Sequence, residues 1–586
     1  MLKEDLKKGI GIPEWAVLQD SEYSDLAFPC FSRAKETGKN PNDIAKEIAG
    51  GIKTAGLVKK VEAVNGYVNI YLNKGAALVK EAEAGKKLVK TNFSGKTVFL
   101  EHTSVNPNKA LHLGHVRNSF IGEFVRRAIE LSGGKVITTN FVEDTGSQVA
   151  DVLVAFKYLG KDVETKDKFD SYCSRIYKEV NEEYEKKPEL KEKRSEILKK
   201  IEAGDSDVTG LLKKVVNRVL AAQIKTLKAN RIKYDMIDLE SHILGEGLIK
   251  EALQKLEETG LVFESTEGET KGCLIIRLDG KDRILRRSDG TLLYVAKDIA
   301  YAFWKHNIIK KKIKYSKFSE NFDGSPILIS DTEGEEKVIG EIDESITLTD
   351  SEQDAEQAVV KTTIGAVNRG GRYTHYSYEQ VALSQKTGES LGLKTDGKFA
   401  RMSGRKGITV EVDSLIEEIK NRIKGAAGSG EMSDEDAFKL GSNIVKYSLL
   451  RMSPSKMVVF DMDEAMSIKG DTAMYINYTY ARAKNILKKL GDLPKKKDID
   501  LDEKESLLVK KMIFVDDAIF DAINNLRPSV LCERLHGLCD EFNTFYESSR
   551  VAGSGREAER GAIVHLFAKN VEKLTELLGL FLLETV

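Results

Sequence analysis

Two histidines at close spacing are the first candidates for chemistry. The pattern His112-Leu-Gly114-His115 follows an apolar segment at 97–102 and precedes helical apolar spacing at 115–134. In an α/β fold, the carboxyl end of a strand and the amino end of the next helix bind phosphates. Gly114 leaves room for close approach, and the imidazoles can donate hydrogen bonds to phosphate oxygens as charge builds in a transition state. With 8 His and 47 Gly in the chain, chance would produce this pattern about 0.01 times.

A second candidate segment is Arg401-Met-Ser-Gly404-Arg-Lys406-Gly407, which is basic and punctuated by glycine. By itself such a segment is typical of a solvated loop. Together with the histidine pair it resembles the two signatures, HIGH and KMSKS, of the class I aminoacyl-tRNA synthetases. That resemblance implies a site for ATP, which both signatures contact.

The surrounding residues resemble one branch of that class, the arginyl-tRNA synthetases. The likeness covers essentially the whole chain in the right order. The matching segments are 25–28 (DLAF), Asn40-Pro41, 66–69 (GYVN), 101–118 (EHTSVNPNKALHLGHVRN), 140–148 (NFVEDTGSQ), 287–301 (RSDGTLLYVAKDIAY), 349–353 (TDSEQ), 450–456 (LRMSPSK), 475–483 (YINYTYARA) and 542–546 (FNTFY).

The resemblance implies three groups of site residues. His112, His115 and Lys109 are expected to be catalytic. The ATP-binding residues are expected to be Asn108, His112, Gly114, His115, Arg401, Met402, Ser403, Arg405 and Lys406. The arginine-binding residues are expected to be Glu101, Asn106, Tyr294, Asp298 and Gln353.

The chemistry of an arginine side chain agrees with this assignment. A guanidinium presents a planar fork of donors and keeps its charge, so its site needs a carboxylate and neutral acceptors. Asp298 lies four residues after Tyr294, and the two share a face if that segment is helical. The family places both residues on the substrate guanidinium.

The implied function is that of an arginine–tRNA ligase. L-arginine attacks the α-phosphorus of ATP, giving arginyl-adenylate and pyrophosphate, and arginine then passes to the 3′-terminal adenosine of tRNA(Arg). Positioning and charge stabilisation suffice for such a reaction without a covalent nucleophile. Mg²⁺ is expected to accompany ATP, and no tightly bound protein metal is expected.

Composition bounds the class of protein. The chain has 586 residues, a net charge of −1 and 41% hydrophobic residues. These values indicate an ordered protein and exclude a polybasic carrier. No segment reads as a signal peptide or a membrane helix, and the five scattered cysteines are typical of reduced core thiols. A cytoplasmic enzyme is therefore expected. We also expect it to be a monomer.

Strand and helix patterns predict how the site is positioned. A strand at 97–102, a helix at 115–134 and a strand at 135–142 form the unit of a doubly wound, Rossmann-like parallel sheet. We expect three domains: an N-terminal α+β domain at 1–85 that contacts the tRNA elbow, a catalytic domain at 90–410 and an all-α helical bundle at 411–586 that contacts the tRNA stem and anticodon. Further strands are predicted at 64–73, 272–278, 291–296 and 345–350, and a helical insertion, either solvated or contacting RNA, is predicted at about 151–270.

Several positions depart from the family. The second lysine of KMSKS is Gly404 and the first is Arg401. Arginyl enzymes that lack the loop lysine carry one at the place of Lys109, which implies that Lys109 supplies this cation. Glu356 stands where the family often has His, and 583–586 lacks the Met-ending arm that supplies an anticodon contact.

A further departure is the segment 310–345, which matches the family poorly. Its basic start is typical of a solvated loop or of a contact with tRNA phosphate. The basic residues concerned are Lys305, Lys310, Lys311, Lys312 and Lys314.

Other functions were weighed against this one. A cysteinyl enzyme would need zinc ligands that the cysteine spacing does not provide, and a glutamyl enzyme would need basic substrate residues. A small nucleotidyltransferase is excluded by the length of the chain. The alternative from another class is a non-catalytic tRNA-binding paralogue, against which His112, His115, Lys109 and Asp298 all argue.

Overall fold

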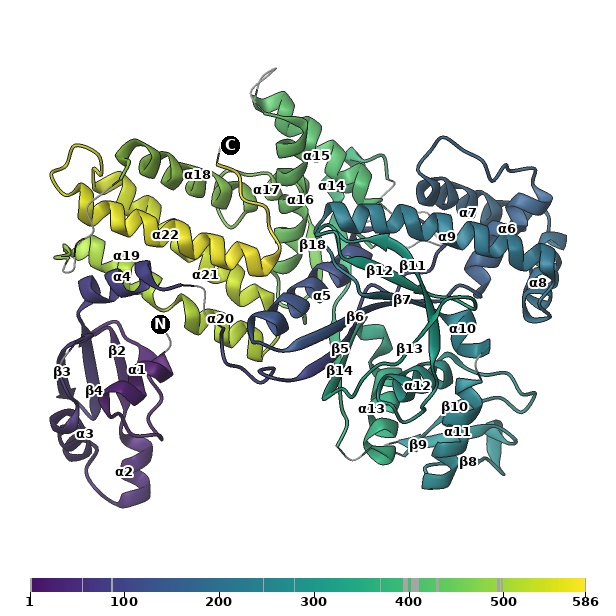
Figure 1. Ribbon diagram of the computed structural model, residues 1–586, viewed down its shortest axis with the longest axis horizontal. Coiled ribbons are helices and arrows are strands. Elements are labelled where there is room, and N and C mark those ends of the chain that lie inside the picture. The colour runs from purple at the N-terminus through teal and green to yellow at the C-terminus, as the bar shows by residue number, and fades with distance from the viewer. Residues whose placement is uncertain are drawn as a thin grey trace. The chain divides into compact units, whose positions relative to one another are not determined.

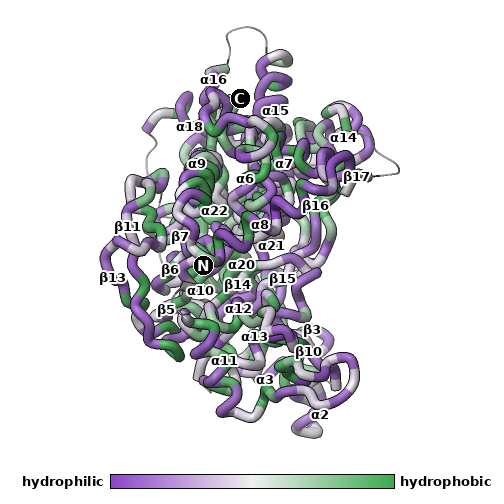
Figure 2. Tube along the Cα trace, turned by 90° about the vertical axis from the view of Figure 1, so that its right-hand side faces the viewer, coloured by the Kyte–Doolittle hydropathy of each residue, from purple (hydrophilic) through white to green (hydrophobic). Residues whose placement is uncertain are grey.

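The computed structural model divides the chain into two compact units, Met1–Thr91 with Ala465–Val586, and Asn92–Glu464. The residues it describes are 3–54, 56–85, 88–245, 247–278, 280–368, 370–393, 399–401, 410–427, 432–492, 496 and 499–584. Hydrophilic and hydrophobic residues are interspersed along the whole chain (Figure 2). Residues 411–464 belong to the second unit, whereas the expected C-terminal domain began at 411.

The first unit starts with a small antiparallel sheet flanked by helices. Its strand order is β1-β2-β4-β3. Gly66 joins β3 to β4 with φ of 77°, and a side chain there would meet the Phe31 ring at 2.8 Å, so glycine is required. The elements are α1 (Lys3–Ile10), β1 (Gln19–Asp20), β2 (Leu26–Pro29), α2 (Phe31–Thr37), α3 (Pro41–Gly51), β3 (Val58–Val64), β4 (Tyr67–Leu72) and α4 (Lys74–Glu83).

The rest of the first unit is a bundle of helices, onto which α4 packs. Lys569 donates hydrogen bonds to the carbonyls of Glu81 and Ala82, both at 3.0 Å, near the C-terminal end of α4. A lysine there satisfies carbonyls that have no partner within the helix. The bundle consists of α18 (Ala473–Leu490), α19 (Glu503–Ile513), α20 (Val515–Asn524), α21 (Pro528–Ser548) and α22 (Glu557–Leu578).

An eight-stranded sheet, in the order β13-β11-β12-β7-β6-β5-β14-β15, forms the centre of the second unit (Figure 1). From β12 to β15 neighbouring strands are parallel, and the chain order reverses between β5 and β14. A doubly wound sheet binds its ligand at the carboxyl ends of its strands at such a reversal. The strands are β5 (Thr97–Glu101), β6 (Lys135–Val142), β7 (Met236–Leu239), β11 (Ile313–Glu320), β12 (Pro326–Ser330), β13 (Glu335–Lys337), β14 (Glu344–Asp350) and β15 (Arg372–Tyr378).

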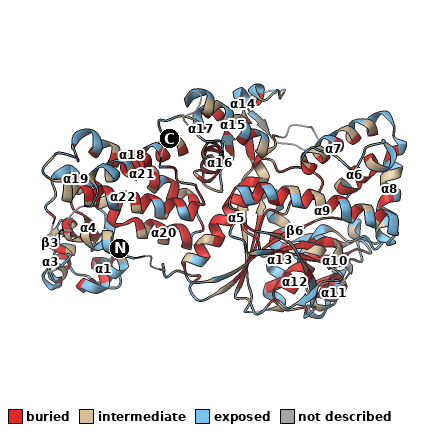
Figure 3. Cartoon of the chain, turned by 45° about the horizontal axis from the view of Figure 1, so that its top comes forward, coloured by how far each residue is buried: buried red, intermediate tan, exposed pale blue. Residues whose placement is uncertain are grey.

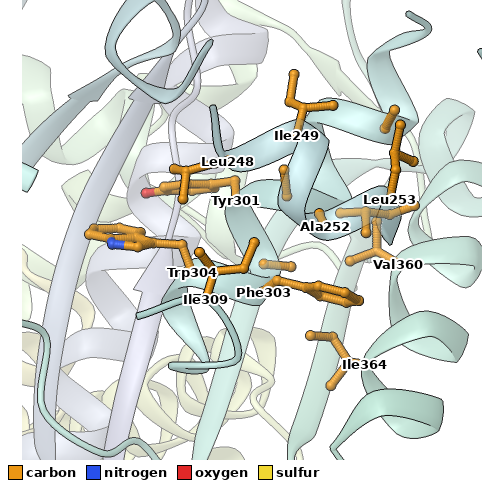
Figure 4. Close-up of a cluster of buried hydrophobic side chains, with 14 of the residues drawn as sticks. Leu248, Ile249, Ala252, Leu253, Tyr301, Phe303, Trp304, Ile309, Val360 and Ile364 are labelled. Carbon is orange, nitrogen blue, oxygen red and sulfur yellow. The ribbon is translucent and has the colours of Figure 1, made fainter. Parts of the chain in front are cut away.

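Helices cover both faces of this sheet. On one face α5 (Leu113–Leu131) is buried along most of its length (Figure 3). On the other face α11 (Leu248–Thr259), α12 (Tyr294–Lys305) and α13 (Asp354–Val367) enclose a hydrophobic cluster (Figure 4). This cluster includes Leu248, Phe303 and Ile364. It fixes α12, the helix that carries the predicted arginine-binding residues.

Smaller elements surround this core. A second sheet has the order β10-β9-β8 and a third the order β17-β16-β18. The remaining elements are α6 (Ser147–Tyr158), α7 (Phe169–Lys186), α8 (Glu189–Glu202), α9 (Ser206–Ala229), α10 (Glu240–Gly245), β8 (Val262–Glu264), β9 (Leu274–Leu278), β10 (Lys281–Arg286), β16 (Val381–Ser384), α14 (Gln385–Ser390), β17 (Phe399–Arg401), α15 (Val412–Ala427), α16 (Asp434–Leu450), β18 (Val458–Phe460) and α17 (Met462–Ala465).

Three local predictions differ from the structure. Residues 291–296 were predicted as a strand, but α12 begins at Tyr294, because a short apolar run fits either a strand or a buried helix. The segment at about 151–270 is not wholly helical, since it contains β7, whose four residues are too few for a periodic signal. Of the basic residues predicted in a solvated or tRNA-contacting loop, Lys310, Lys311 and Lys312 do lie in a loop, whereas Lys305 ends α12 and Lys314 lies in β11. Most of the rest of the segment 310–345 forms β11 to β13.

Candidate functional site

His112 and His115 cap each other at the start of α5. The backbone N–H of each donates to Nδ1 of the other at 3.3 Å, and the two rings stack with centroids 3.4 Å apart. Because both Nδ1 atoms accept hydrogen bonds, each neutral ring carries its proton on Nε2. Burial, followed by the charge of Lys109, lowers the pKa of His112 to about 3, and burial lowers the pKa of His115 as well. The pair therefore presents two neutral Nε2–H donors.

Gly114 is needed for this reciprocal cap. A Cβ at position 114 would lie 3.1 Å from Cε1 and 3.2 Å from Nδ1 of His112. Such contacts would push the His112 ring away from the backbone N–H of His115, which donates a hydrogen bond to it. The glycine thus makes room for the histidine itself, a role that the spacing in the sequence did not reveal.

The loop between β5 and α5 is held in an unusual backbone conformation. Thr103 and Ser104 have φ values of 78° and 45°, a region that costs energy for residues other than glycine. Their backbone N–H groups donate to Asn118 Oδ1 at 2.6 Å and Asn140 Oδ1 at 2.9 Å. Further along, Asn108 is completely buried and neither atom of its amide has a partner within the described structure. A buried amide without partners is expected to bind a ligand or water.

Lys109 lies beside the histidine pair. Its Nζ donates to Gln148 Oε1 at 3.1 Å, and its charge lowers the pKa of both histidines, so its ammonium lies within their electrostatic reach. The Lys109 carbonyl accepts a hydrogen bond from Gln223 Nε2 of α9 at 2.8 Å. The helical insertion therefore fixes this loop from outside.

The second signature falls mostly outside the described residues. Arg401 ends β17, whereas Met402, Ser403, Gly404, Arg405 and Lys406 are not described. The chain after them is joined to the first signature: Val412 N donates to Leu111 O at 2.9 Å, and Glu411 pairs with His112 as an isolated β-bridge. The roles predicted for the signature residues stay predictions.

Asp298 and Tyr294 lie one turn apart on α12. The Asp298 carboxylate is half-buried, and in the described part of the chain it forms no hydrogen bond or ion pair. Burial, and then the charge of Glu101, raise its pKa to about 7, while Lys305 and Lys297 oppose the rise. It is therefore a carboxylate ready to accept a cationic group.

Glu101, also predicted to bind arginine, is already engaged. Its Oε2 lies 2.5 Å from Nζ of the buried Lys305 and accepts a hydrogen bond from Thr347 Oγ1 at 3.2 Å. Lys305, which the sequence analysis placed in a solvated or tRNA-contacting basic segment, is thus buried against Glu101 and Thr347. The reason is tertiary: α12 ends above the sheet, and its last turn faces β5.

Glu143 is a site residue that the sequence reasoning missed. Its carboxylate accepts from Asn106 Nδ2 at 3.3 Å and forms a hydrogen bond with Tyr294, so it bridges two predicted arginine-binding residues. A side chain at Gly146 would lie 2.3 Å from Glu143 Oε1. The sequence offered one signal for Glu143: it lies in the family-matching segment 140–148, three residues before Gly146.

Two glutamines near the start of α13, Gln353 and Gln357, differ in their placement. Gln353 is exposed at the amino end of α13, and its role in binding arginine stays a prediction. Gln357, one turn later, is 3% exposed and accepts a hydrogen bond from the Tyr373 hydroxyl. Tyr373 also lies within electrostatic reach of Asp298. The structure therefore brings Gln357, rather than Gln353, into the network around the pocket.

The charged groups around Asp298 favour a cationic ligand. Together with Asp298 they comprise four carboxylates, those of Glu101, Glu143, Glu240 and Asp298, and the ammonium groups of Lys297 and Lys305. Lys297 pairs with Glu240 Oε1 at 2.8 Å. An excess of buried carboxylates is stable only when cations or protons compensate it.

Among the described residues, no group of three or more His, Cys, Asp or Glu side chains could hold a metal ion.

In the described part of the chain, no helix has the length and apolar character that a membrane crossing requires.

Comparisons with known proteins identify the family to which the chain belongs. A family profile described as "tRNA synthetases class I (R), catalytic domain" matches residues 76–318. An arginine–tRNA ligase of Deinococcus radiodurans is 30% identical over 99% of this chain and 99% of its own length. The chain belongs to the arginyl-tRNA synthetases. Another arginine–tRNA ligase, from Thermus thermophilus, is 31% identical over 92% of this chain and 90% of its own.

Solved structures agree with membership of the arginyl-tRNA synthetases. The Thermus thermophilus arginyl-tRNA synthetase matches all of this chain and all of its own with a TM-score of 0.85 at 28% identity. Two further profiles cover the first unit: "Arginyl tRNA synthetase N terminal domain" at residues 3–72 and "DALR anticodon binding domain" at 476–586. The predicted fold class, a doubly wound catalytic domain with an N-terminal and a helical C-terminal domain, is confirmed.

Proposed function

We propose that this arginine–tRNA ligase activates L-arginine with ATP and transfers it to the 3′-terminal adenosine of tRNA(Arg). The observation that carries the proposal is the Asp298 carboxylate of α12, which forms no hydrogen bond or ion pair among the described residues and lies within electrostatic reach of Glu101 and Glu240, together with the reciprocally capped histidines at the start of α5. We further propose that the enzyme acts as a monomer in the cytoplasm.

In the first step, the carboxylate of arginine attacks the α-phosphorus of ATP in line, and pyrophosphate leaves. The Nε2–H groups of His112 and His115 donate to phosphate oxygens, and the neutral rings need no protonation change during the reaction. Lys109 brings a positive charge to the departing pyrophosphate, and the partner-free amide of Asn108 binds the nucleotide. Preorganised donors of this kind each contribute about 10²–10³ in rate.

The arginine side chain enters the acidic pocket. Asp298 receives the guanidinium, with the Tyr294 hydroxyl beside it, and Asn106 with Glu143 binds the amino end of the substrate. The two cationic groups of arginine offset the excess of carboxylates in the pocket. A neutral side chain of the same shape would leave the partly desolvated Asp298 carboxylate without a counter-charge, which is costly.

In the second step, the 2′-hydroxyl of the terminal tRNA adenosine takes the arginyl group from the adenylate. An aromatic and cationic surface in the first unit supports tRNA binding. The Arg482 guanidinium lies 4.7 Å from the Tyr478 ring centre and 4.4 Å from that of Tyr546, and both rings are partly exposed. Stacked arginine and tyrosine groups bind unpaired bases.

The direct test is tRNA charging with each of the twenty amino acids in parallel. We expect arginine alone to be attached, and Asp298→Asn to abolish charging while the matched exposed control Asp289→Asn leaves it unchanged. Charging with another amino acid, or equal activity of both variants, would refute the assignment.

A further inference from the structure

Arg117, in the second turn of α5, is completely buried, and its guanidinium binds backbone carbonyls. Nη1 donates to the carbonyls of Glu379 and, at 3.3 Å, of Gln380. Nη2 donates to the carbonyls of Ser453 at 3.2 Å and Lys456 at 3.0 Å. Among the described residues the guanidinium forms no ion pair with a carboxylate. A permanent positive charge is thus compensated inside the protein by carbonyl dipoles.

The four carbonyls belong to two segments that meet at Arg117: the connection between β15 and β16, and the turn before β18. Glu379 N donates to Pro454 O at 2.8 Å, and Val458 N donates to Gln380 O at 3.1 Å. Because these hydrogen bonds join the two segments, the segments keep a fixed relative position. Arg117 attaches both of them to α5 at once.

The first of these segments leads directly into the strands beside the second signature. β16 begins at Val381, immediately after Gln380. It pairs in parallel with β18 and antiparallel with β17. In the antiparallel pair Ala382 lies opposite Arg401, the residue at which β17 ends and the second signature begins. The start of β16 therefore determines where the backbone of Arg401 lies.

The chain that follows the second signature is attached to the same end of α5. Val412 N donates to Leu111 O at 2.9 Å, and Glu411 pairs with His112 as an isolated β-bridge. The chain before the signature reaches α5 through β17, β16 and the guanidinium of Arg117. Both sides of the second signature are therefore anchored to the helix that carries the two histidines.

The planar fork of an arginine suits this position. Its two terminal nitrogens serve different segments, with two carbonyls each. A lysine has a single nitrogen and would serve one pair of carbonyls at a time. The Arg117 guanidinium also lies 5.9 Å from the centre of the Tyr378 ring, whose hydroxyl accepts from Asn118 Nδ2 at 3.0 Å. These contacts fix the guanidinium from several sides.

We propose that Arg117 is a positioning residue for adenylate formation: it holds the start of β16, and through β17 the beginning of the second signature, in a fixed place relative to His112 and His115. The inference rests on the proposed function and on the ATP-binding role predicted for the second signature. Arg117 itself does not touch ATP. Its effect is confined to the step in which arginine attacks the α-phosphorus and pyrophosphate leaves, because both signatures must then bind the phosphates of one ATP.

The test measures the two steps of the reaction separately. Pyrophosphate release from ATP in a single turnover, with arginine and tRNA present, reports adenylate formation. Transfer of arginine from synthetic arginyl-adenylate to tRNA bypasses ATP and reports the second step. We expect Arg117→Met to slow pyrophosphate release about 10²-fold, since a displacement of about 1 Å can cost that much in rate, and to leave the transfer rate nearly unchanged.

Two further variants separate positioning from general stability. Arg117→Lys keeps the charge and one pair of carbonyl contacts, so it should slow pyrophosphate release about tenfold and also spare transfer. Arg127→Met is the matched control, because Arg127 is another arginine of α5 and pairs with Glu123 at 2.6 Å. It should leave the ratio of the two rates at the wild-type value. Circular dichroism gives the folded fraction by which every rate is divided, and if Arg117→Met does not fold, Arg117→Lys carries the same test.

Equal slowing of both steps by the Arg117 variants would overturn the inference, because it would indicate general damage to the domain. Wild-type rates of pyrophosphate release in these variants would also overturn it, as would an equally large change of the rate ratio in Arg127→Met. In each of these cases wild-type charging with arginine would still stand. Failure of the wild-type protein to charge tRNA with arginine would instead refute the proposed function, and the inference with it.

Discussion

The two histidines of the first signature act as neutral donors because each Nδ1 is occupied by the other's backbone N–H. In the proposed mechanism His112 has two roles: it caps α5, and its Nε2–H donates to the phosphates of ATP. The two roles can be separated experimentally, since asparagine is a good capping residue but does not reproduce the reach of an imidazole.

We expect His112→Ala to lower the rate of adenylate formation by about 10²–10³ and the free energy of unfolding by about 1 kcal/mol. His112→Asn should recover the stability but not the rate. Single-turnover adenylate formation and chemical denaturation measure the two effects. Parallel losses or parallel recovery in both assays would contradict two separate roles.

At Asp298 we expect arginine recognition to depend on pH. Its pKa is raised to about 7 in the free protein, so below that pH the protonated form competes with the guanidinium. The kcat/KM for arginine should rise as the pH increases through about 7, whereas KM for ATP should not follow. A flat arginine profile between pH 6 and 8 would show that Asp298 is already ionised or does not contact the substrate.

Lys109 is expected to replace the cation that Gly404 does not provide. Lys109→Ala should lower kcat about 10²-fold or more, in line with the loss of a charged donor to the phosphates. Gly404→Lys should be mild by itself and should partly restore activity in the Lys109→Ala background. Single-turnover rates of the four proteins form a double-mutant cycle, and additive effects would mean that Lys109 serves another purpose.

At the scale of elements, helices from the insertion hold the catalytic loop. Gln223 of α9 donates to the Lys109 carbonyl, and Ser174 of α7 accepts from Ala110 N at 2.9 Å. The same two helices contact the chain after the second signature, because Ser171 donates to Glu411 at 2.7 Å and Thr226 to Asp413 at 2.8 Å. The insertion therefore supports the loop of the candidate site, a role that the prediction of a solvated or RNA-contacting insertion did not include.

We expect Gln223→Ala to reduce kcat for adenylate formation about tenfold, since loss of a buried hydrogen bond costs about 1–3 kcal/mol and frees the loop that carries Lys109. Lys225→Ala, at an exposed position of the same helix, is the control. Pyrophosphate exchange in the presence of tRNA measures the effect. Equal activity of the two variants would show that α9 does not position the loop.

At the scale of the whole molecule, the sites proposed for chemistry and for tRNA binding lie in different units. The candidate ATP and arginine residues all lie in the unit Asn92–Glu464, whereas the aromatic and cationic surface around Arg482 lies in the other unit. This division predicts that a substitution in the surface around Arg482 alters the affinity for tRNA without altering the chemical step.

Arg482→Ala should raise KM for tRNA about tenfold or more and leave kcat nearly unchanged, because a stacking group contributes about 1–3 kcal/mol for each base. Lys488→Ala, an exposed lysine on the same helix, removes a charge without removing the stack. Steady-state charging at varied tRNA concentrations measures both. A loss confined to kcat would place Arg482 in communication between the units instead of in binding.

The local pattern determined the βαβ unit, the histidine pair and the family, because strand alternation, helix periodicity and short signatures are properties of neighbouring residues. It did not reveal β7, Glu143 or the buried position of Lys305. Those depend on which distant segments meet: a four-residue strand is recognised only by its neighbours in the sheet, and the charge state of Asp298 depends on side chains from β5, α10 and α12. Burial and pairing are decided by tertiary packing, which brings acidic and basic residues that lie far apart in the sequence into one cluster.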